Sequence, residues 1–218
     1  MKNIAECMPS ATKYEIGTKL AREFYANDNT LAIARELLGK LLVVPDEVNG
    51  RVSGMIVETE AYLGIHDRAA HSYGGRRTAR NEVMYCSGGS VYVFFVYGMY
   101  HQFNVVTGPV DHPHAILIRA LEPVEGVEIM RQRRGAMQDR NLTSGPGKLC
   151  IALRIDRSFN GEDLLGDKSW VEEYRTLSEH EISVGRRIGI DYAGEDAAKP
   201  WRFWVTGNPF VSKTPPNR

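Results

Sequence analysis

The sequence has little cysteine, no net charge and no long hydrophobic run. Only three of its 218 residues are cysteines, and no C-x-x-C pair occurs, so neither a disulfide framework nor a four-cysteine zinc site is expected. No stretch reaches the ~18 consecutive apolar residues of a membrane-spanning helix, and the first ten residues lack the apolar core of a secretory signal. These absences favour a protein of the reducing cytoplasm with no membrane partner.

Charge is balanced across the chain but unevenly placed. With 27 basic and 27 acidic residues, the chain as a whole has no field that would attract nucleic acid. Two short stretches, 66–80 and 131–140, nevertheless carry four arginines each against one aspartate. Such patches suit a phosphate-binding face. A solvated surface without a ligand is the alternative.

The pattern of apolar residues predicts one α+β domain. Strands are predicted at 41–44, 52–62, 91–97, 101–106 and 115–121. Helices are predicted near 30–38, 125–133 and 148–153. Because strands follow one another without regular helices between them, we expect a mixed, mainly antiparallel, curved sheet with flanking helices rather than a doubly wound parallel sheet. The domain is expected to span 19–213, between a weakly ordered segment at 1–18 and a tail at 214–218.

The longest predicted strand ends in an unusual polar pattern. Strand side chains alternate, so Glu58, Glu60 and Tyr62 share one face. Acidic residues are depleted in strands, and burying a charge is costly unless it is paired. Arg119 interrupts another predicted core strand, and the two carboxylates are available to pair with it. A strand end that faces solvent is the alternative.

Two further segments suggest binding surfaces. Residues 69–77 combine His71 with glycines and arginines, which suits close backbone approach to a phosphate. Residues 97–100, Tyr-Gly-Met-Tyr, are predicted to form the tip of a protruding β-hairpin, and Asn104 follows in the return strand. Large apolar groups on a turn indicate a binding surface, unless they fold back onto the core.

No metal or other cofactor is predicted. The spacing of His66 and His71 matches no common zinc motif. The segment 144–149 lacks the spacing of a nucleotide-binding loop. A metal-dependent hydrolase that uses His66, Asp67 and His71 stays open as an alternative, and activity in the presence of a strong chelator would exclude it.

Taken together, these segments resemble those of a known family, the alkyladenine (N-methylpurine, 3-methyladenine) DNA glycosylases of the vertebrate type. The similarity runs from about residue 20 to residue 212, with the motifs in the same order. The matching segments are Glu60-Ala61-Tyr62, Ala70-His71-Ser72, Arg80-Asn81, Tyr97-Gly98-Met99-Tyr100, Asn104, Arg119-Ala120-Leu121-Glu122-Pro123 and Leu142-Thr143-Ser144-Gly145-Pro146-Gly147-Lys148-Leu149.

The resemblance implies a monofunctional, metal-free enzyme of base excision repair. It would bind damaged double-stranded DNA as a monomer and flip an alkylated or deaminated purine out of the duplex. It would then hydrolyse the N-glycosidic bond with an activated water. In a bacterium such an enzyme would be cytoplasmic and associated with the nucleoid, and in a eukaryote it would be nuclear.

Carried over by position, the resemblance makes Glu60 the general base and Arg119 the residue that positions it. Tyr97 would fill the gap that the flipped nucleotide leaves in the duplex, with Met99 beside it. Arg76 would contact the DNA backbone. The main alternative from another class is a catalytically silent nucleic-acid-binding module on the same scaffold. Glu60 argues against that module, because a binder gains nothing from a carboxylate near phosphates.

The resemblance also supplies a base pocket. Tyr62 and His71 would sandwich the flipped base, with Phe94 completing the wall. Asn104 would line the pocket and obstruct the exocyclic amine of guanine. Phe94 stands where the family commonly has tyrosine, so the stacking face is kept but a hydroxyl group is lost.

Overall fold

The computed structural model describes residues 17–48, 50–96, 98–135 and 138–213. Residues 1–16 of the segment predicted to be weakly ordered lie outside the described residues. Tyr97 and the predicted tail at 214–218 also lie outside them. Gly17 and Thr18 bond to the backbone of Glu173, which ties the first described residues to the rest of the domain.

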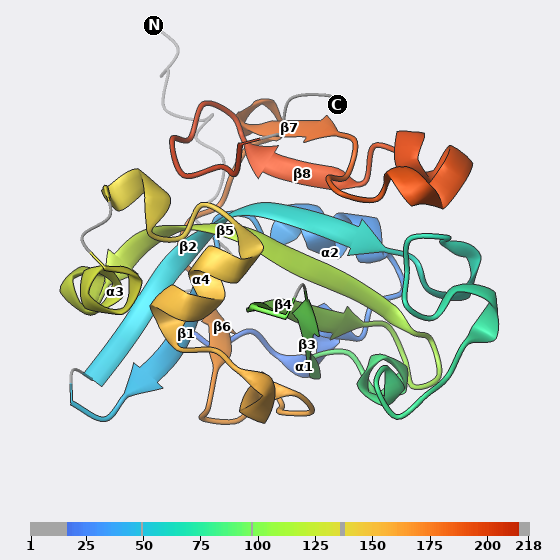
Figure 1. The fold of residues 1–218 in the computed structure, drawn as a ribbon, viewed down its shortest axis with the longest axis horizontal. Coiled ribbons are helices and arrows are strands. Elements are labelled where there is room, and N and C mark those ends of the chain that lie inside the picture. The colour runs from blue at the N-terminus through green and yellow to red at the C-terminus, as the bar shows by residue number, and fades with distance from the viewer. Residues whose placement is uncertain (1–16, 49, 97, 136–137, 214–218) are drawn as a thin grey trace, which may run out of the picture.

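The described residues contain one eight-stranded sheet in which neighbouring strands pair antiparallel (Figure 1). The strand order is β3-β4-β5-β2-β1-β6, and β8 pairs with both β2 and β7. The predicted mainly antiparallel sheet is therefore confirmed. The strands are β1 (Leu41–Asp46), β2 (Gly50–Tyr62), β3 (Val91–Val96), β4 (Tyr100–Thr107), β5 (His114–Glu125), β6 (Trp170–Glu172), β7 (Ile182–Gly185) and β8 (Arg202–Val205).

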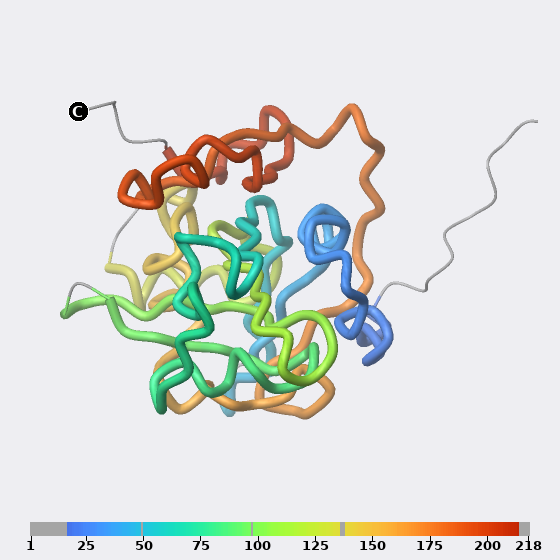
Figure 2. The backbone as a smooth tube through the Cα atoms, turned by 90° about the vertical axis from the view of Figure 1, so that its right-hand side faces the viewer, coloured from blue at the N-terminus to red at the C-terminus, as the bar shows by residue number. Residues whose placement is uncertain are grey.

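Helices cover both faces of the sheet. Figures 1 and 2 place α2 on one face and α3 with α4 on the other. No helix of the described residues is long and apolar enough to cross a membrane. The α-helices are α1 (Arg22–Tyr25), α2 (Thr30–Glu36), α3 (Val127–Arg134) and α4 (Pro146–Leu153). Short 3₁₀ turns lie at Gly64–His66, Tyr73–Gly75, Glu82–Tyr85, Asp139–Asn141, Arg157–Phe159, Glu179–Glu181 and Asp191–Ala198.

Two helix boundaries differ from prediction for local reasons. β5 continues to Glu125, four residues beyond the predicted strand end, and Gly126 then turns the chain with a φ of 69° before α3 begins. That left-handed conformation favours glycine. α4 begins at Pro146 rather than at Lys148, because proline is well suited to the first turn of a helix, where its missing N–H has no partner to lose.

Strand β2 runs through the centre of the domain. Residues 52–61 are all buried, because β2 pairs with β1, β5 and β8 and helices pack on both faces of the sheet. The alternative of a solvent-facing strand end at Glu58 and Glu60 is therefore wrong, since both residues are 0% exposed.

The β3–β4 hairpin extends beyond the rest of the domain, at the left in Figure 2. Its strands pair as far as Val96 and Tyr100, and Met99 at the tip is 65% exposed. The predicted protruding hairpin is confirmed. Next to the tip, the Cα of Gly147 in α4 lies so close to the Tyr100 ring that a Cβ there would meet ring carbons at 2.8–2.9 Å. Glycine at this position thus permits α4 to pack against the hairpin.

Candidate active site

A pocket of about 180 Å³ opens between the hairpin, the segment around residue 70 and the loop 188–192. The structure brings the four predicted base-binding residues together in its wall. Arg119 also reaches this wall. Glu60 is fully buried and contacts three of the lining residues, Tyr62, Arg119 and Ile188. The four base-binding residues are Tyr62, His71, Phe94 and Asn104.

Glu60 is held by three donors. Its Oε2 accepts a hydrogen bond from the Tyr62 hydroxyl at 2.9 Å and pairs with Arg119 Nη1 at 3.1 Å. Its Oε1 accepts the backbone N–H of Ile188 at 2.7 Å. Burial, followed by the nearby Glu60 carboxylate, raises the pKa of Tyr62 well above its usual range. The phenol therefore stays protonated and donates to Glu60.

Glu58 lies two residues earlier on β2 and is held more completely. Its Oε1 accepts from Arg119 Nε at 2.9 Å, from Arg202 Nε at 2.7 Å and from the Ser212 hydroxyl at 2.8 Å. Its Oε2 accepts the Ser212 backbone N–H at 2.7 Å. Arg119 thus bridges both carboxylates, as predicted. Burial lowers the pKa of Arg119, but Glu60 and Glu58 outweigh it and the net direction is upward.

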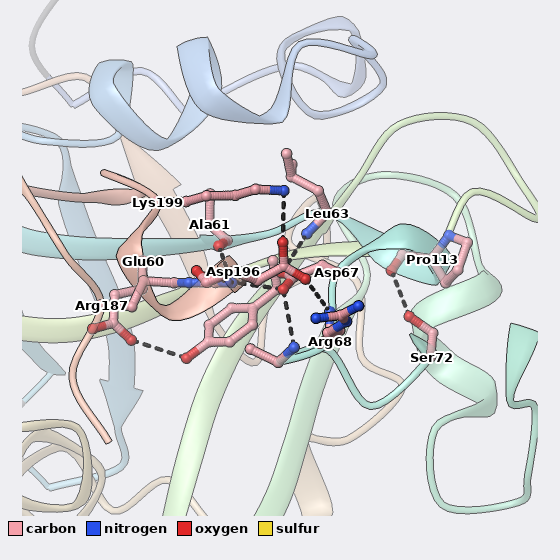
Figure 3. Close-up of polar contacts among 12 residues, drawn as sticks. Glu60, Ala61, Leu63, Asp67, Arg68, Ser72, Pro113, Arg187, Asp196 and Lys199 are labelled. Carbon is pink, nitrogen blue, oxygen red and sulfur yellow. Dashed lines mark hydrogen bonds and ion pairs between the residues drawn. The ribbon is translucent and has the colours of Figure 1, made fainter. Parts of the chain in front are cut away.

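A second buried ion pair joins Arg187 to Asp67 (Figure 3). Arg187 donates to both oxygens of Asp67, at 2.5 and 2.8 Å, and to the carbonyl of Ala61 at 2.9 Å. Its guanidinium lies 4.8 Å from the Tyr62 ring centroid and 4.9 Å from that of Trp201. Because Ile188 follows directly, Arg187 anchors the loop whose N–H contacts Glu60.

His71 enters the pocket as a neutral imidazole. Burial, then the charges of Arg80 and Arg76, lower the pKa of His71 to about 4. Its Nδ1 lies 2.8 Å from the Tyr92 hydroxyl, and its ring packs edge-on against Phe94 with centroids 4.6 Å apart. These contacts fix the imidazole in the pocket wall.

Asn104 is fixed in the pocket by its own amide. It is 4% exposed, and its Nδ2 donates to the carbonyls of Tyr92 at 3.1 Å and Gln102 at 3.3 Å. Both N–H groups are used, so this side chain forms a rigid part of the pocket lining.

Of the predicted DNA contacts, Arg76 and Met99 do not line this pocket. Arg76 lines a neighbouring pocket of about 270 Å³, together with Arg68 and Arg80. His71 and Tyr192 line both this pocket and the base-sized pocket. Met99 lies at the hairpin tip, and Tyr97 falls outside the described residues.

The residues of the metal-hydrolase alternative do not form a ligand set. Both Asp67 oxygens bond to Arg187, His66 is exposed and His71 Nδ1 contacts Tyr92. Within the described part of the chain, no three His, Cys, Asp or Glu side chains gather in a way that could hold a metal ion.

Sequence reasoning missed several partners of the carboxylates. Arg187, Arg202, Ser212 and the Ile188 N–H come from the last 35 residues of the chain, and none stands in a recognisable motif. An isolated arginine or serine in a polar segment carries no local signal of its partner, because that partner lies 120 or more residues away.

Fold and pocket together place an aromatic-lined pocket beside a buried, ion-paired carboxylate. Comparison with known proteins identifies the family. Residues 23–209 match the methylpurine-DNA glycosylase (MPG) family. The chain belongs to this family and is a DNA glycosylase.

Close relatives are bacterial proteins that carry the name "Putative 3-methyladenine DNA glycosylase". The protein of Desulfitobacterium hafniense is 54% identical over 89% of this chain and 98% of its own length. The one from Clostridium acetobutylicum is 50% identical over 89% and 97%, and the one from Bacillus cytotoxicus 52% over 87% and 97%. These relatives support the family but not the narrower likeness to its vertebrate type.

Proposed function

We propose that this protein is a monofunctional glycosylase that removes alkylated or deaminated purines from duplex DNA and so initiates base excision repair. One observation carries the proposal: three residues that line an aromatic pocket also contact a buried carboxylate, and this carboxylate retains capacity for one more hydrogen bond. An ionised carboxylate offers about four acceptor positions, and three donors contact Glu60.

The pocket wall suits a flipped purine, above all a cationic one. Tyr62, His71 and Phe94 offer ring faces and edges to a flat base. A purine methylated at a ring nitrogen carries positive charge, which electron-rich rings attract. His71 is neutral above pH about 4, so it adds no opposing charge. Stacking in the pocket offsets part of the few kcal/mol needed to unstack the base.

Glu60 would act as the general base. As the bond between the sugar C1′ and the base nitrogen breaks, positive charge develops on the sugar, and a water oxygen bonds to C1′ while its proton passes to Glu60. A cationic lesion leaves as a neutral base without needing a proton. The carboxylate also stabilises the developing charge electrostatically. Arg119 and the Ile188 N–H would hold Glu60 in position as this charge develops.

Asn104 would provide selectivity against guanine. Its amide is fixed by two carbonyls, so it cannot swing aside for the exocyclic amine that guanine carries and hypoxanthine lacks. Guanine would be rejected because its exocyclic amine either pushes the base out of position or stays without a hydrogen-bond acceptor against the fixed Asn104 side chain. Phe94 would stack without the hydroxyl hydrogen bond that a tyrosine could add.

The hairpin and the arginine-lined pocket would hold the duplex. Tyr97 would fill the gap left by the flipped nucleotide, as inserted apolar wedges do in other bent or opened duplexes. Met99, two residues further along the chain, is exposed. Arg76 would contact a backbone phosphate, and this contact would contribute affinity without sequence preference.

A glycosylase assay with wild-type protein tests the proposal. Duplexes containing hypoxanthine, ethenoadenine or 7-methylguanine should release the free base and leave an intact strand with an abasic site, which breaks only after alkali. Release should persist in EDTA. Strand cleavage without alkali would contradict the monofunctional mechanism, and loss of release in EDTA would favour the metal-dependent alternative.

A further inference from the structure

The arginines of the second arginine-rich stretch, 131–140, differ in whether a carboxylate pairs with them. In the second stretch, Arg131 pairs with Glu128 and Asp139, and Arg133 pairs with Asp46 at 2.6 Å. These arginines belong to ordinary ion pairs of the surface. Arg134 and Arg140 have no carboxylate partner among the described residues.

Arg140 lines a pocket of about 340 Å³ beside the N-terminus of α4, which we call the Lys148 pocket. Its polar lining comes from Arg119, Arg140, Asn141, Ser144, Lys148, Ser212 and Lys213, and it includes no acidic residue. Arg119 is committed to Glu58 and Glu60. The uncompensated positive charge of the pocket therefore comes from Arg140, Lys148 and Lys213.

These cations are crowded without a counter-charge. Burial, and then the charges of Arg134 and Lys213, lower the pKa of Lys148. Among the described residues, Lys148 Nζ donates a single hydrogen bond, a long one of 3.4 Å to the Ser144 hydroxyl. Arg134 has a buried Nε with no partner among the described residues. An anion placed here would gain charge-assisted hydrogen bonds and relieve the mutual repulsion of these groups.

The Lys148 pocket adjoins the base pocket at a different wall from Arg76. Arg119 and Ile188 line both the base pocket and the Lys148 pocket. The pocket of Arg76 adjoins through His71 and Tyr192 instead. No residue lines both cationic pockets. A flipped nucleotide is joined to its strand by a phosphate on each side, so two separate cationic pockets fit the two directions in which the strand leaves the site.

We propose that the Lys148 pocket binds a backbone phosphate of the lesion strand next to the flipped nucleotide, with Lys148 and Arg140 as its principal ligands. The inference rests on the proposed function, because it takes the neighbouring pocket to hold the flipped base. It assigns a second anchoring point to the strand, distinct from Arg76.

Salt-dependent binding gives the first test. Lys148→Gln and Arg140→Gln should each weaken binding of a hypoxanthine duplex roughly three- to tenfold at low salt, and should each reduce the slope of log K against log salt by about one. Arg140 is exposed, so its variant leaves the core undisturbed. The matched control is Lys168→Gln, which removes the same charge from a lysine paired with Glu162 outside the pocket; its affinity and slope should stay at wild-type values.

Neutral methylphosphonate linkages then locate the phosphate. Each linkage flanking the lesion is replaced in turn and tested with the wild-type protein and with Lys148→Gln. At one position next to the lesion, the replacement should weaken wild-type binding several-fold but weaken the variant no further, because both changes remove the same contact.

Two results would overturn the inference. In the first, Lys148→Gln or Arg140→Gln keeps the affinity and salt slope of wild type, as Lys168→Gln should. In the second, the losses of affinity from Lys148→Gln and from the neutral linkage add at every position. Additive losses are expected if the pocket binds a free anion or no anion. Release of hypoxanthine by the wild-type protein reports on the proposed function separately. A protein that releases the base but shows additive losses retains the function and loses only this phosphate site.

Discussion

Glu60 differs in one respect from the other buried carboxylates around the pocket, Glu58 and Asp67. All three are 0% exposed. Glu58 accepts from four donor groups, and Asp67 accepts two N–H groups of Arg187 and the backbone N–H groups of Leu63 and Ala69. Glu60 accepts two hydrogen bonds, from Tyr62 and Ile188, and forms an ion pair with Arg119. Glu60 therefore has the smallest donor set of the three, and its partners Tyr62, Arg119 and Ile188 all line the pocket. We expect Glu58 and Asp67 to stabilise the fold and Glu60 to accept the proton from water.

The difference between Glu58 and Glu60 comes from what covers each one. Both contact Arg119, but Ser212 supplies two donors to Glu58. Glu60 instead contacts Tyr62 and Ile188, which both line the pocket. Neighbours on a strand can therefore have different roles when separate segments of the chain pack over them.

The largest effect is expected for Glu60→Gln. This change keeps the shape and most hydrogen bonds but removes both the base and the charge, so single-turnover release of hypoxanthine should fall by roughly 10²–10⁴. Binding of the lesion duplex should stay within a few-fold of wild type, as measured by titration. Release near the wild-type rate would show that Glu60 is not the base.

Glu58→Gln and Asp67→Asn test whether the other two buried carboxylates stabilise the fold. Each leaves a buried arginine without its full counter-charge, so the free energy of unfolding should fall by about 3–5 kcal/mol. Urea denaturation of both variants beside Glu60→Gln provides the measurement. Unfolding free energies at the wild-type value for both variants would contradict the assignment of these carboxylates to structure.

A pH-dependent loss of stability is expected from His71. Because burial lowers its pKa to about 4, the unfolded state takes up the proton first as the pH falls below 6.5, and the native state loses about 2 kcal/mol between pH 7 and pH 5. His71→Gln should remove this part of the loss, while His66→Gln, at an exposed position, should keep it. Equal pH dependence in both variants, by urea denaturation, would contradict the burial of a neutral imidazole.

The smallest effect is expected at the pocket wall. Asn104→Ser shortens a fixed side chain, so excision of guanine relative to hypoxanthine should rise by roughly tenfold. Competing release from duplexes of matched sequence measures the ratio. An unchanged ratio would mean that Asn104 does not exclude the guanine amine.

Much of the sheet could be predicted because its strands carry long apolar runs. The strands at 52–62, 91–97 and 101–106 were predicted within a few residues. The pairing of Arg119 with Glu58 and Glu60 followed from the cost of burying charges in core strands. β6, β7 and β8 were missed, because strands of three or four residues with polar members lack a clear periodicity.

The candidate site was predicted residue by residue only through the family resemblance. Alternation placed Glu58 and Glu60 on one face, but it could not rank them. The ranking depends on Ser212 and on the Ile188 N–H, which reach β2 from more than 120 residues away. Tertiary contacts of this kind leave no periodic trace in the sequence.

The most direct test of the account is the ratio of two single-turnover rate constants, that of Glu60→Gln to that of Glu58→Gln. Both are measured on the same hypoxanthine duplex with enzyme in saturating excess, at a temperature where both variants are folded. The account predicts a ratio of about 10⁻² or lower, because Glu60 is the proposed base, whereas Glu58 is enclosed by Arg119, Arg202 and Ser212. A ratio near one, or above it, would contradict the distinction between the two carboxylates.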